Sequence, residues 1–209
     1  MQALPEMSGP DGATSGGASP SGTSITCFTP GTRITTIRGR VPVETLVPGD
    51  RILTRDRGFQ PLLWLGWRPL CATATGSQAA DAPVRIRAGA LGPGMPERDM
   101  IVSGHHHVLY FDPGLRADHG EPEALIEARA LIGQPGIEMI RRDRLWYVHL
   151  LLEQHEVILS ENAWTESFLL TSAARQALGE VPSIKTSDLP THIPARLCLR
   201  TRALVTVRP

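Results

Sequence analysis

Short runs of alternating apolar and polar residues fill the chain from Thr26 onward, and this period of two is typical of β-strands with one buried face. The runs are separated by turns that contain glycine or proline. The pattern predicts strands at 33–37, 51–55, 59–67, 84–87, 100–103, 106–111, 145–152 and 156–160. Val47-Pro48-Gly49-Asp50 has proline and glycine at the central positions of a type II turn. Many short strands with closely spaced turns predict an all-β domain.

Three further segments carry a less regular pattern. Residues 123–132 fit a helix by their Ala, Glu and Leu content, but their apolar runs also fit strands, so both remain open. Residues 165–178 have helical spacing, with Thr165 or Ser167 as a cap and Gly179 as the stop. The proline-containing segment that follows ends in the β-prone residues 202–207, and we expect it to wrap back over the domain.

The ends of the chain differ from its middle. Residues 1–25 are mostly Gly, Ser, Ala, Thr and Pro, and we expect this leader to be disordered because it has too little apolar surface to offset chain entropy. Residues 26–170 form the predicted β domain, and 171–209 a short helix with a wrapping tail. A chain of 209 residues is long enough for one such core.

Composition excludes several classes of function. The 21 basic and 21 acidic residues balance and the basic residues do not cluster, so we expect no nucleic-acid partner. No apolar run is long enough to span a membrane, and the N-terminus lacks the basic region and apolar stretch of a signal peptide, so we expect a cytoplasmic protein. Cys27, Cys71 and Cys198 are odd in number and widely spaced, which fits a reducing compartment. We interpret Cys71 and Cys198 as structural, with Cys71 the more exposed.

Cys27 stands where the leader gives way to the first predicted strand. A thiolate there lies next to the carbonyl group of the preceding residue, as a self-cleaving nucleophile requires. A cysteine at this position is also compatible with a small buried hydrophobe that starts a strand.

Three consecutive histidines, His105, His106 and His107, are the second chemical feature. On an extended strand His105 and His107 face one way and His106 the other, so at most two of them could bind one ion. We therefore expect no metal or other cofactor. One of the three could instead transfer protons near neutral pH, and at least one is expected to be a solvated surface residue.

Large and charged side chains elsewhere have simpler interpretations. Trp64, Trp67 and Trp146 lie in predicted strands and are expected in the core. Glu156 and Glu166 could act as bases, but we interpret them as solvated carboxylates.

Several sequence blocks together resemble one family. Cys27-Phe28-Thr29-Pro30-Gly31-Thr32, followed by Val43-Glu44-x-Leu46-x-x-Gly49-Asp50, is similar to the first block of the Hint superfamily, the Hedgehog/intein autoprocessing domains, and of its bacterial Hint group in particular. Later blocks match in order at 85–91, 103–107, 147–149, 155–158 and 165–168. The resemblance implies a horseshoe of short strands built from two pseudo-symmetric halves.

The resemblance also implies a reaction. Cys27 would attack the carbonyl group of Thr26 in an N-to-S acyl shift, and water or another nucleophile, not yet identified, would resolve the thioester. The substrate would be the protein's own leader, so the activity would be a self-cleavage without turnover. Ser103-x-x-His106 matches the Thr-x-x-His motif of the family. His106 would then polarise the scissile amide and protonate its nitrogen, with Ser103 as a hydrogen-bonding support.

Two other histidines match less specific positions of the family. His155 falls where inteins have their late-block histidine, and His149 is the other candidate for a second proton carrier. Asp50 is interpreted as structural, with its side chain fixing the turn.

Departures from the family pattern limit these expectations. Splicing inteins end in His-Asn, whereas this chain has Trp164-Thr165-Glu166-Ser167, so we expect no splicing. Gly104 and His107 replace a proline and an arginine of the motif, which leaves the choice between His105 and His106 open. The alternative function is a catalytically idle Hint-fold interaction module. A cysteine hydrolase that acts on other chains is a weaker alternative, because the leader would first have to vacate the groove.

Overall fold

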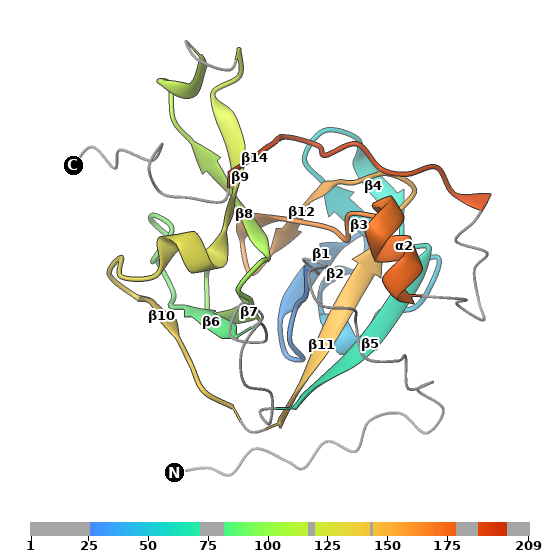
Figure 1. Ribbon diagram of the computed structural model, residues 1–209, viewed down its shortest axis with the longest axis horizontal. Helices are drawn as coiled ribbons and strands as arrows, with labels where there is room; N and C mark the ends of the chain where they lie inside the picture. Colours follow the sequence, from blue (N-terminus) through green and yellow to red (C-terminus); the bar gives the residue numbers. More distant parts are fainter. Residues whose placement is uncertain (1–25, 72–81, 117–119, 143, 179–187, 200–209) are drawn as a thin grey trace.

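The computed structural model describes residues 26–71, 82–116, 120–142, 144–178 and 188–199. These residues form an almost entirely β structure, as the alternating pattern predicts (Figure 1). The expected leader (1–25), the β-prone residues 202–207 and the expected helix stop Gly179 lie outside the described residues.

The largest sheet has the strand order β14-β9-β8-β13-β12-β1-β3-β4, and β2 pairs with β1. Its strands are β1 (Arg33–Thr36), β2 (Gly39–Pro42), β3 (Arg51–Thr54), β4 (Gly58–Pro61), β8 (His107–Phe111), β9 (Glu123–Glu127), β12 (Val157–Ser160), β13 (Ala163–Glu166) and β14 (Leu197–Leu199). The pairing of β14 with β9 is parallel, so the end of the described chain returns to the sheet as an edge strand.

Two smaller sheets complete the fold. Their strands are β6 (Pro83–Ile86), β7 (Met100–Ser103) and β10 (Ile137–Met139) in one sheet, and β5 (Trp64–Cys71) and β11 (Arg144–Leu151) in the other. Short helices follow some strands: η1 (Val43–Thr45), η3 (Ala128–Leu131) and α2 (Ser172–Leu178). The long β5–β11 ribbon is clear in Figure 1, with α2 beside it. None of the helices in the described ranges is long and apolar enough to cross a membrane.

The predicted type II turn is confirmed. The amide of Asp50 donates to the carbonyl oxygen of Val47 at 3.0 Å, and Gly49 has the positive φ, 96°, that this turn requires. The Asp50 carboxylate accepts from the Val47 amide at 3.0 Å and from Arg38. The structural interpretation of Asp50 is therefore confirmed.

The helix expected at 165–178 is wrong in its first part. Thr165 belongs to β13, where it pairs with Ile158, and α2 begins only at Ser172. The N-cap residue of α2 is Thr171, whose Oγ1 accepts from the amide of Ala174 at 3.0 Å. Ser167 instead accepts from the amide of Glu156. Strand pairing here outweighs the local helical spacing.

Other elements differ in smaller ways. The ambiguous segment 123–132 is strand first and 3-10 helix afterwards, and the strand expected at 59–67 is divided between β4 and β5. Trp64, Trp67 and Trp146 lie at the edge of the core and are half-buried, with Trp67 and Trp146 in an edge-to-face contact at 6.2 Å. β14 was not predicted, because three residues carry too little pattern.

Candidate functional site

The segment around Cys27 lies between two strands in the interior. The amides and carbonyl groups of Phe28 and Val148 exchange two hydrogen bonds of 2.9 Å, and the Ser103 amide donates to the Cys27 carbonyl oxygen at 3.0 Å. Val148 is in β11 and Ser103 ends β7, so both strands fix the main chain at Cys27. The Cys27 side chain is fully buried.

Two side chains hold the Thr26-Cys27 peptide bond from opposite sides. The amide of Cys27 donates to Ser103 Oγ at 3.2 Å, and Nδ1 of His149 lies 2.9 Å from the carbonyl oxygen of Thr26. Nε2 of the same histidine is 3.9 Å from Cys27 Sγ. A carbonyl oxygen only accepts hydrogen bonds, so Nδ1 carries the proton and, in the neutral ring, Nε2 presents a lone pair to the thiol.

The surroundings of His149 keep it neutral. Burial, with a smaller contribution from Arg68, lowers the pKa of His149 to about 4, against the hydrogen bond to Thr26, which raises it. The Trp64 indole stacks on the imidazole at 6.3 Å with the planes 4° apart, and Phe168 contacts its edge at 5.4 Å. Gly66 pairs with His149 across the β5–β11 ribbon, and a Cβ there would overlap the Trp64 ring. Glycine thus leaves the space that this stacking needs.

The His106 ring packs against the ring of Phe28. The two rings meet edge to face at 4.4 Å, and the His106 side chain is buried. Neither ring nitrogen has a hydrogen-bond partner among the described residues. Burial lowers the pKa of His106 to about 4, so this ring is also neutral at pH 7. A buried imidazole without partners is unusual and is the kind of exception that functional sites contain.

The expected alternation of the three histidines is wrong. β8 begins only at His107, and the amide of His106 donates to the Ser103 carbonyl oxygen at 3.0 Å, so His105 and His106 lie in a turn. His105 Nδ1 is 3.4 Å from Glu127, and only 12% of its side chain is exposed. None of the three is the solvated surface residue that we expected.

Glu166 joins two histidines in the interior. Its Oε1 accepts from Nδ1 of His107 at 2.5 Å and from the same residue's amide at 2.8 Å, while Oε2 is 3.1 Å from Nε2 of His155. The amide of Ala195 donates to Nδ1 of His155 at 2.9 Å, so Nε2 of His155 carries the proton towards Glu166. Burial by itself would raise the pKa of Glu166, but the two histidines hold it well below its usual range.

The interpretation of Glu156 and Glu166 as solvated carboxylates is therefore wrong, since both are buried. Glu156 pairs with Arg57 at 2.9 Å. The role of Glu166 could not be found from sequence, because nothing local marks a carboxylate whose partners lie 59 and 11 residues away. In the described part of the chain, no three His, Cys, Asp or Glu side chains converge as metal ligands would.

The structure thus gathers part of the predicted site at one peptide bond. Cys27, Ser103 and His149 meet at the Thr26-Cys27 bond. The other two histidines make their side-chain contacts elsewhere. The His106 ring contacts Phe28, and the His155 ring contacts Glu166 and the amide of Ala195.

The chain belongs to the Hint domain family, whose model matches residues 26–172. This confirms the resemblance found in the sequence and the Hint-like all-β fold. Among solved structures it is similar to the gp41-1 intein, with 10% identity, a TM-score of 0.38 and coverage of 67% of this chain and 97% of the intein. A bacterial intein-like domain from Clostridium thermocellum has 14% identity, a TM-score of 0.44 and coverage of 66% and 96%.

A splice-inactive variant of the AceL NrdHF class 3 split intein gives similar values, with 12% identity, a TM-score of 0.44 and coverage of 68% of this chain and 97% of the intein. No curated protein matches significantly.

Proposed function

We propose that this Hint domain cleaves its own chain at the Thr26-Cys27 bond through a thioester. The observation that carries the proposal is the position of one imidazole. His149 contacts the oxygen of the carbonyl group whose carbon would be attacked, and its other nitrogen faces the thiol that would attack.

The first step forms the thioester bond. A free thiol with a pKa near ~8.5 is only slightly ionised at neutral pH, so Cys27 needs a base. Nε2 of neutral His149 takes the thiol proton, and Sγ attacks the carbonyl carbon of Thr26. Negative charge then develops on the Thr26 oxygen, towards which Nδ1–H of His149 already points from 2.9 Å.

The second step breaks the carbon–nitrogen bond. The departing Cys27 nitrogen needs one proton, which equals the one lost by the thiol, so the shift consumes none overall. Ser103 Oγ, 3.2 Å from this nitrogen, orients it. The His149 imidazolium carries the proton back, and His106, whose ring nitrogens have no partner among the described residues, is the second proton carrier.

The thioester is then resolved without splicing. Water or an added thiol attacks the Thr26 carbonyl carbon and Cys27 Sγ leaves. Both ring nitrogens of His155 are engaged, by Glu166 and by the Ala195 amide, so we assign it a positioning role.

The alternative is an idle Hint-fold interaction module, and the complete burial of Cys27 favours it, because a resolving nucleophile has no open path to Sγ. Intact mass of the full chain during incubation with dithiothreitol separates the two functions. Self-cleavage predicts one fragment that ends at Thr26 and another that begins at Cys27, absent in Cys27→Ala and unchanged in the matched variant Cys198→Ala. Uncleaved chain after prolonged incubation would support the idle module.

A further inference from the structure

Residues beyond the family match pack into the apolar cluster that contains Cys27. The Hint match ends at 172, and the chain continues as α2 and then, among the described residues, as the segment 188–199. We call α2 together with 188–199 the cap. In Figure 1 the cap is drawn in orange and red, with α2 beside the β5–β11 ribbon and the later segment crossing to β9.

The cap takes part in the apolar group that encloses Cys27. Ala174 of α2 is buried in the same cluster as Cys27, Tyr147 and Phe168, and Leu189 of the later segment packs against this cluster. Cys27 has no exposed surface, although a resolving nucleophile has to reach its thioester. Part of the barrier around the thiol is therefore formed by residues outside the Hint match.

Hydrogen bonds hold the near end of the cap in place. The Arg175 guanidinium donates to the Leu189 carbonyl oxygen at 2.6 Å, which joins α2 to the later segment. The amide of His192 donates to the Leu170 carbonyl oxygen at 2.9 Å, and the Leu170 amide donates to Nδ1 of His192 at 3.3 Å.

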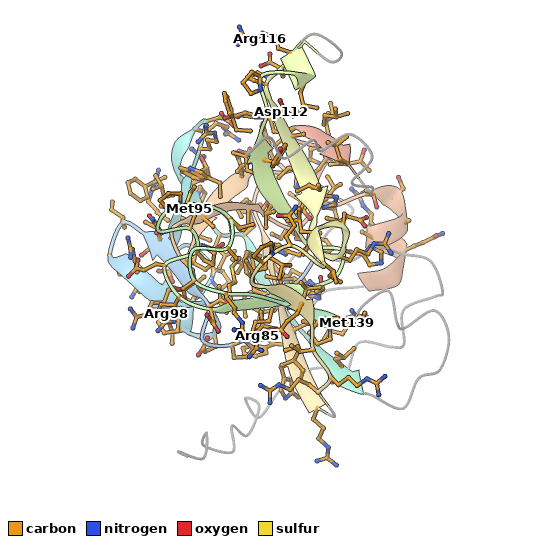
Figure 2. The ribbon with its side chains drawn as sticks, turned by 90° about the vertical axis from the view of Figure 1, so that its left-hand side faces the viewer. Arg85, Met95, Arg98, Asp112, Arg116 and Met139 are labelled. Atoms are coloured by element: carbon orange, nitrogen blue, oxygen red, sulfur yellow. The ribbon has the colours of Figure 1, made fainter. Side chains whose placement is uncertain are left out.

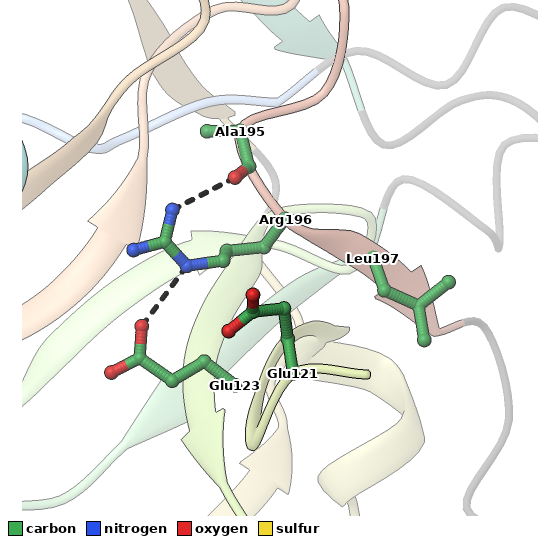
Figure 3. A pocket seen from close by; sticks show the side chains of 5 residues that line it. All are labelled: Glu121, Glu123, Ala195, Arg196 and Leu197. Carbon is green, nitrogen blue, oxygen red and sulfur yellow. Dashed lines mark hydrogen bonds and ion pairs between the residues drawn. The ribbon is translucent and has the colours of Figure 1, made fainter. Parts of the chain in front are cut away.

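The far end of the cap is held by polar contacts. Arg196 pairs with Asp56 at 2.7 Å. It also pairs with Glu123 at 3.0 Å, as Figure 3 shows. Beside it is a cavity of 390 Å³ lined by Glu121, Glu123, Ala195, Arg196 and Leu197. Arg196 and Glu123 are mostly buried, and beyond them β14 pairs with β9. Opening of the cap at this end therefore requires the loss of both the ion pairs and the strand pairing.

We infer that the cap is a gate over Cys27 that determines when solvent nucleophiles reach the thioester. Closed, it excludes water and thiols from Sγ and from the Thr26 carbonyl carbon; opened from the Arg196 end, it admits them. The protection of the thioester rests on the proposed function, whereas the shielding of the thiol does not.

Alkylation of Cys27 by iodoacetamide tests the gate directly. The full chain carries Cys71→Ser and Cys198→Ser, so that Cys27 is the only thiol, and peptide mass gives the rate of its modification. Arg196→Ala removes the ion pairs at the far end, and Leu189→Ser removes an apolar side chain packed against the cluster that contains Cys27. We expect each to raise the alkylation rate about 10-fold, because local opening becomes easier.

Arg85→Ala is the matched control. Arg85 pairs with Glu138 at 2.7 Å, beside Met139 on the face formed by β6 and β10 (Figure 2). Its loss removes a similar ion pair and leaves the cap intact. Equal alkylation rates in Arg196→Ala and Arg85→Ala would overturn the gate. The gate would also be overturned if the increase in alkylation rate were fully explained by a lower free energy of global unfolding. Urea unfolding of each variant measures that free energy.

Cleavage of the same variants distinguishes the gate from the reaction. With the gate and the self-cleavage both correct, Arg196→Ala releases the 1–26 fragment faster than Arg85→Ala when no thiol is added. Faster alkylation without cleavage in any variant would refute the proposed function and leave the shielding of Cys27 supported. Cleavage with unchanged alkylation would refute the gate alone.

Discussion

His149 makes two contacts at the Thr26-Cys27 bond, one with each of its ring nitrogens. Its Nδ1–H points at the carbonyl oxygen of Thr26 and its Nε2 faces Sγ of Cys27. Because burial keeps the ring neutral, the same side chain can accept the thiol proton and stabilise the developing oxyanion. His106 has the motif spacing but contacts only Phe28 among the described rings.

Substitutions at His149 separate its two roles. His149→Ala removes both, and we expect dithiothreitol-driven cleavage to slow by about 10² to 10⁴-fold, as for loss of a general base. His149→Asn has an amide N–H near the position of Nδ1 and can still donate to the Thr26 oxygen, but it cannot take the thiol proton, so it should be nearly as slow. His105→Ala is the control, because its ring contacts Glu127, and should cleave within about 2-fold of wild type.

His106→Ala completes the comparison. As second proton carrier, His106 should have a smaller effect than His149 on the same rate. A large loss in His106→Ala with wild-type cleavage in His149→Ala would reverse the two assignments and return the main role to the Ser-x-x-His motif.

The same two histidines make stability depend on pH. The pKa of each is lowered from 6.5 to about 4 in the folded protein, so the unfolded chain binds protons first as pH falls. The free energy of unfolding is therefore unaffected by the titration of these two groups above pH 6.5. It falls between about pH 6.5 and 4, by about 3 kcal/mol for each group. Urea unfolding at pH 7 and pH 4.5 measures this loss.

His106→Leu provides the check on that pH dependence. It removes one of the two buried titrating rings, so its free energy of unfolding should fall less between pH 7 and 4.5 than that of wild type. An identical fall in both proteins would mean that His106 does not contribute.

At the scale of elements, β13 delivers Glu166 to a place between β8 and His155. The carboxylate accepts three hydrogen bonds, two from His107 and one from His155. His155 in turn accepts a hydrogen bond from the amide of Ala195 in the cap. A strand of the main sheet is thereby linked to the cap through one imidazole.

Glu166→Gln should destabilise the fold by about 2–4 kcal/mol. The amide of glutamine has one accepting oxygen, so either the His107 or the His155 donor would face an N–H group. Glu138→Gln, in which an exposed carboxylate on β10 changes in the same way, is the control and should alter the free energy of unfolding by less than about 0.5 kcal/mol. Similar urea midpoints for both variants would contradict the role given to Glu166.

The sequence predicts the elements better than their side-chain contacts. Period-two runs predict most strands of the main sheet, and Pro48-Gly49 predicts the turn, because these signals are local. The helix expected from Thr165 fails because β13 pairs with β12, and the alternation of His105 to His107 fails because a turn precedes β8. The first error comes from strand pairing that outweighs local pattern, and the second from a local turn that the run of histidines does not reveal.

At the scale of the whole molecule, the site depends on the complete fold. Ser103 and His149 are 76 and 122 residues from Cys27 and reach it on β7 and β11. The family blocks identify these residues as candidates. They do not reveal which imidazole meets the carbonyl oxygen, since that follows from the pairing of Val148 with Phe28 and the space at Gly66.

Hydroxylamine trapping tests for the thioester between Thr26 and Cys27, because hydroxylamine attacks a thioester much faster than a peptide bond. The full chain is incubated with hydroxylamine, and the small fragment is analysed by mass spectrometry beside Cys27→Ala and Cys198→Ala. We predict a 1–26 peptide that carries a hydroxamate on the Thr26 carbonyl carbon, formed by wild type and Cys198→Ala and not by Cys27→Ala. Equal cleavage in Cys27→Ala, or a hydroxamate at any other residue, would contradict a thioester between Thr26 and Cys27.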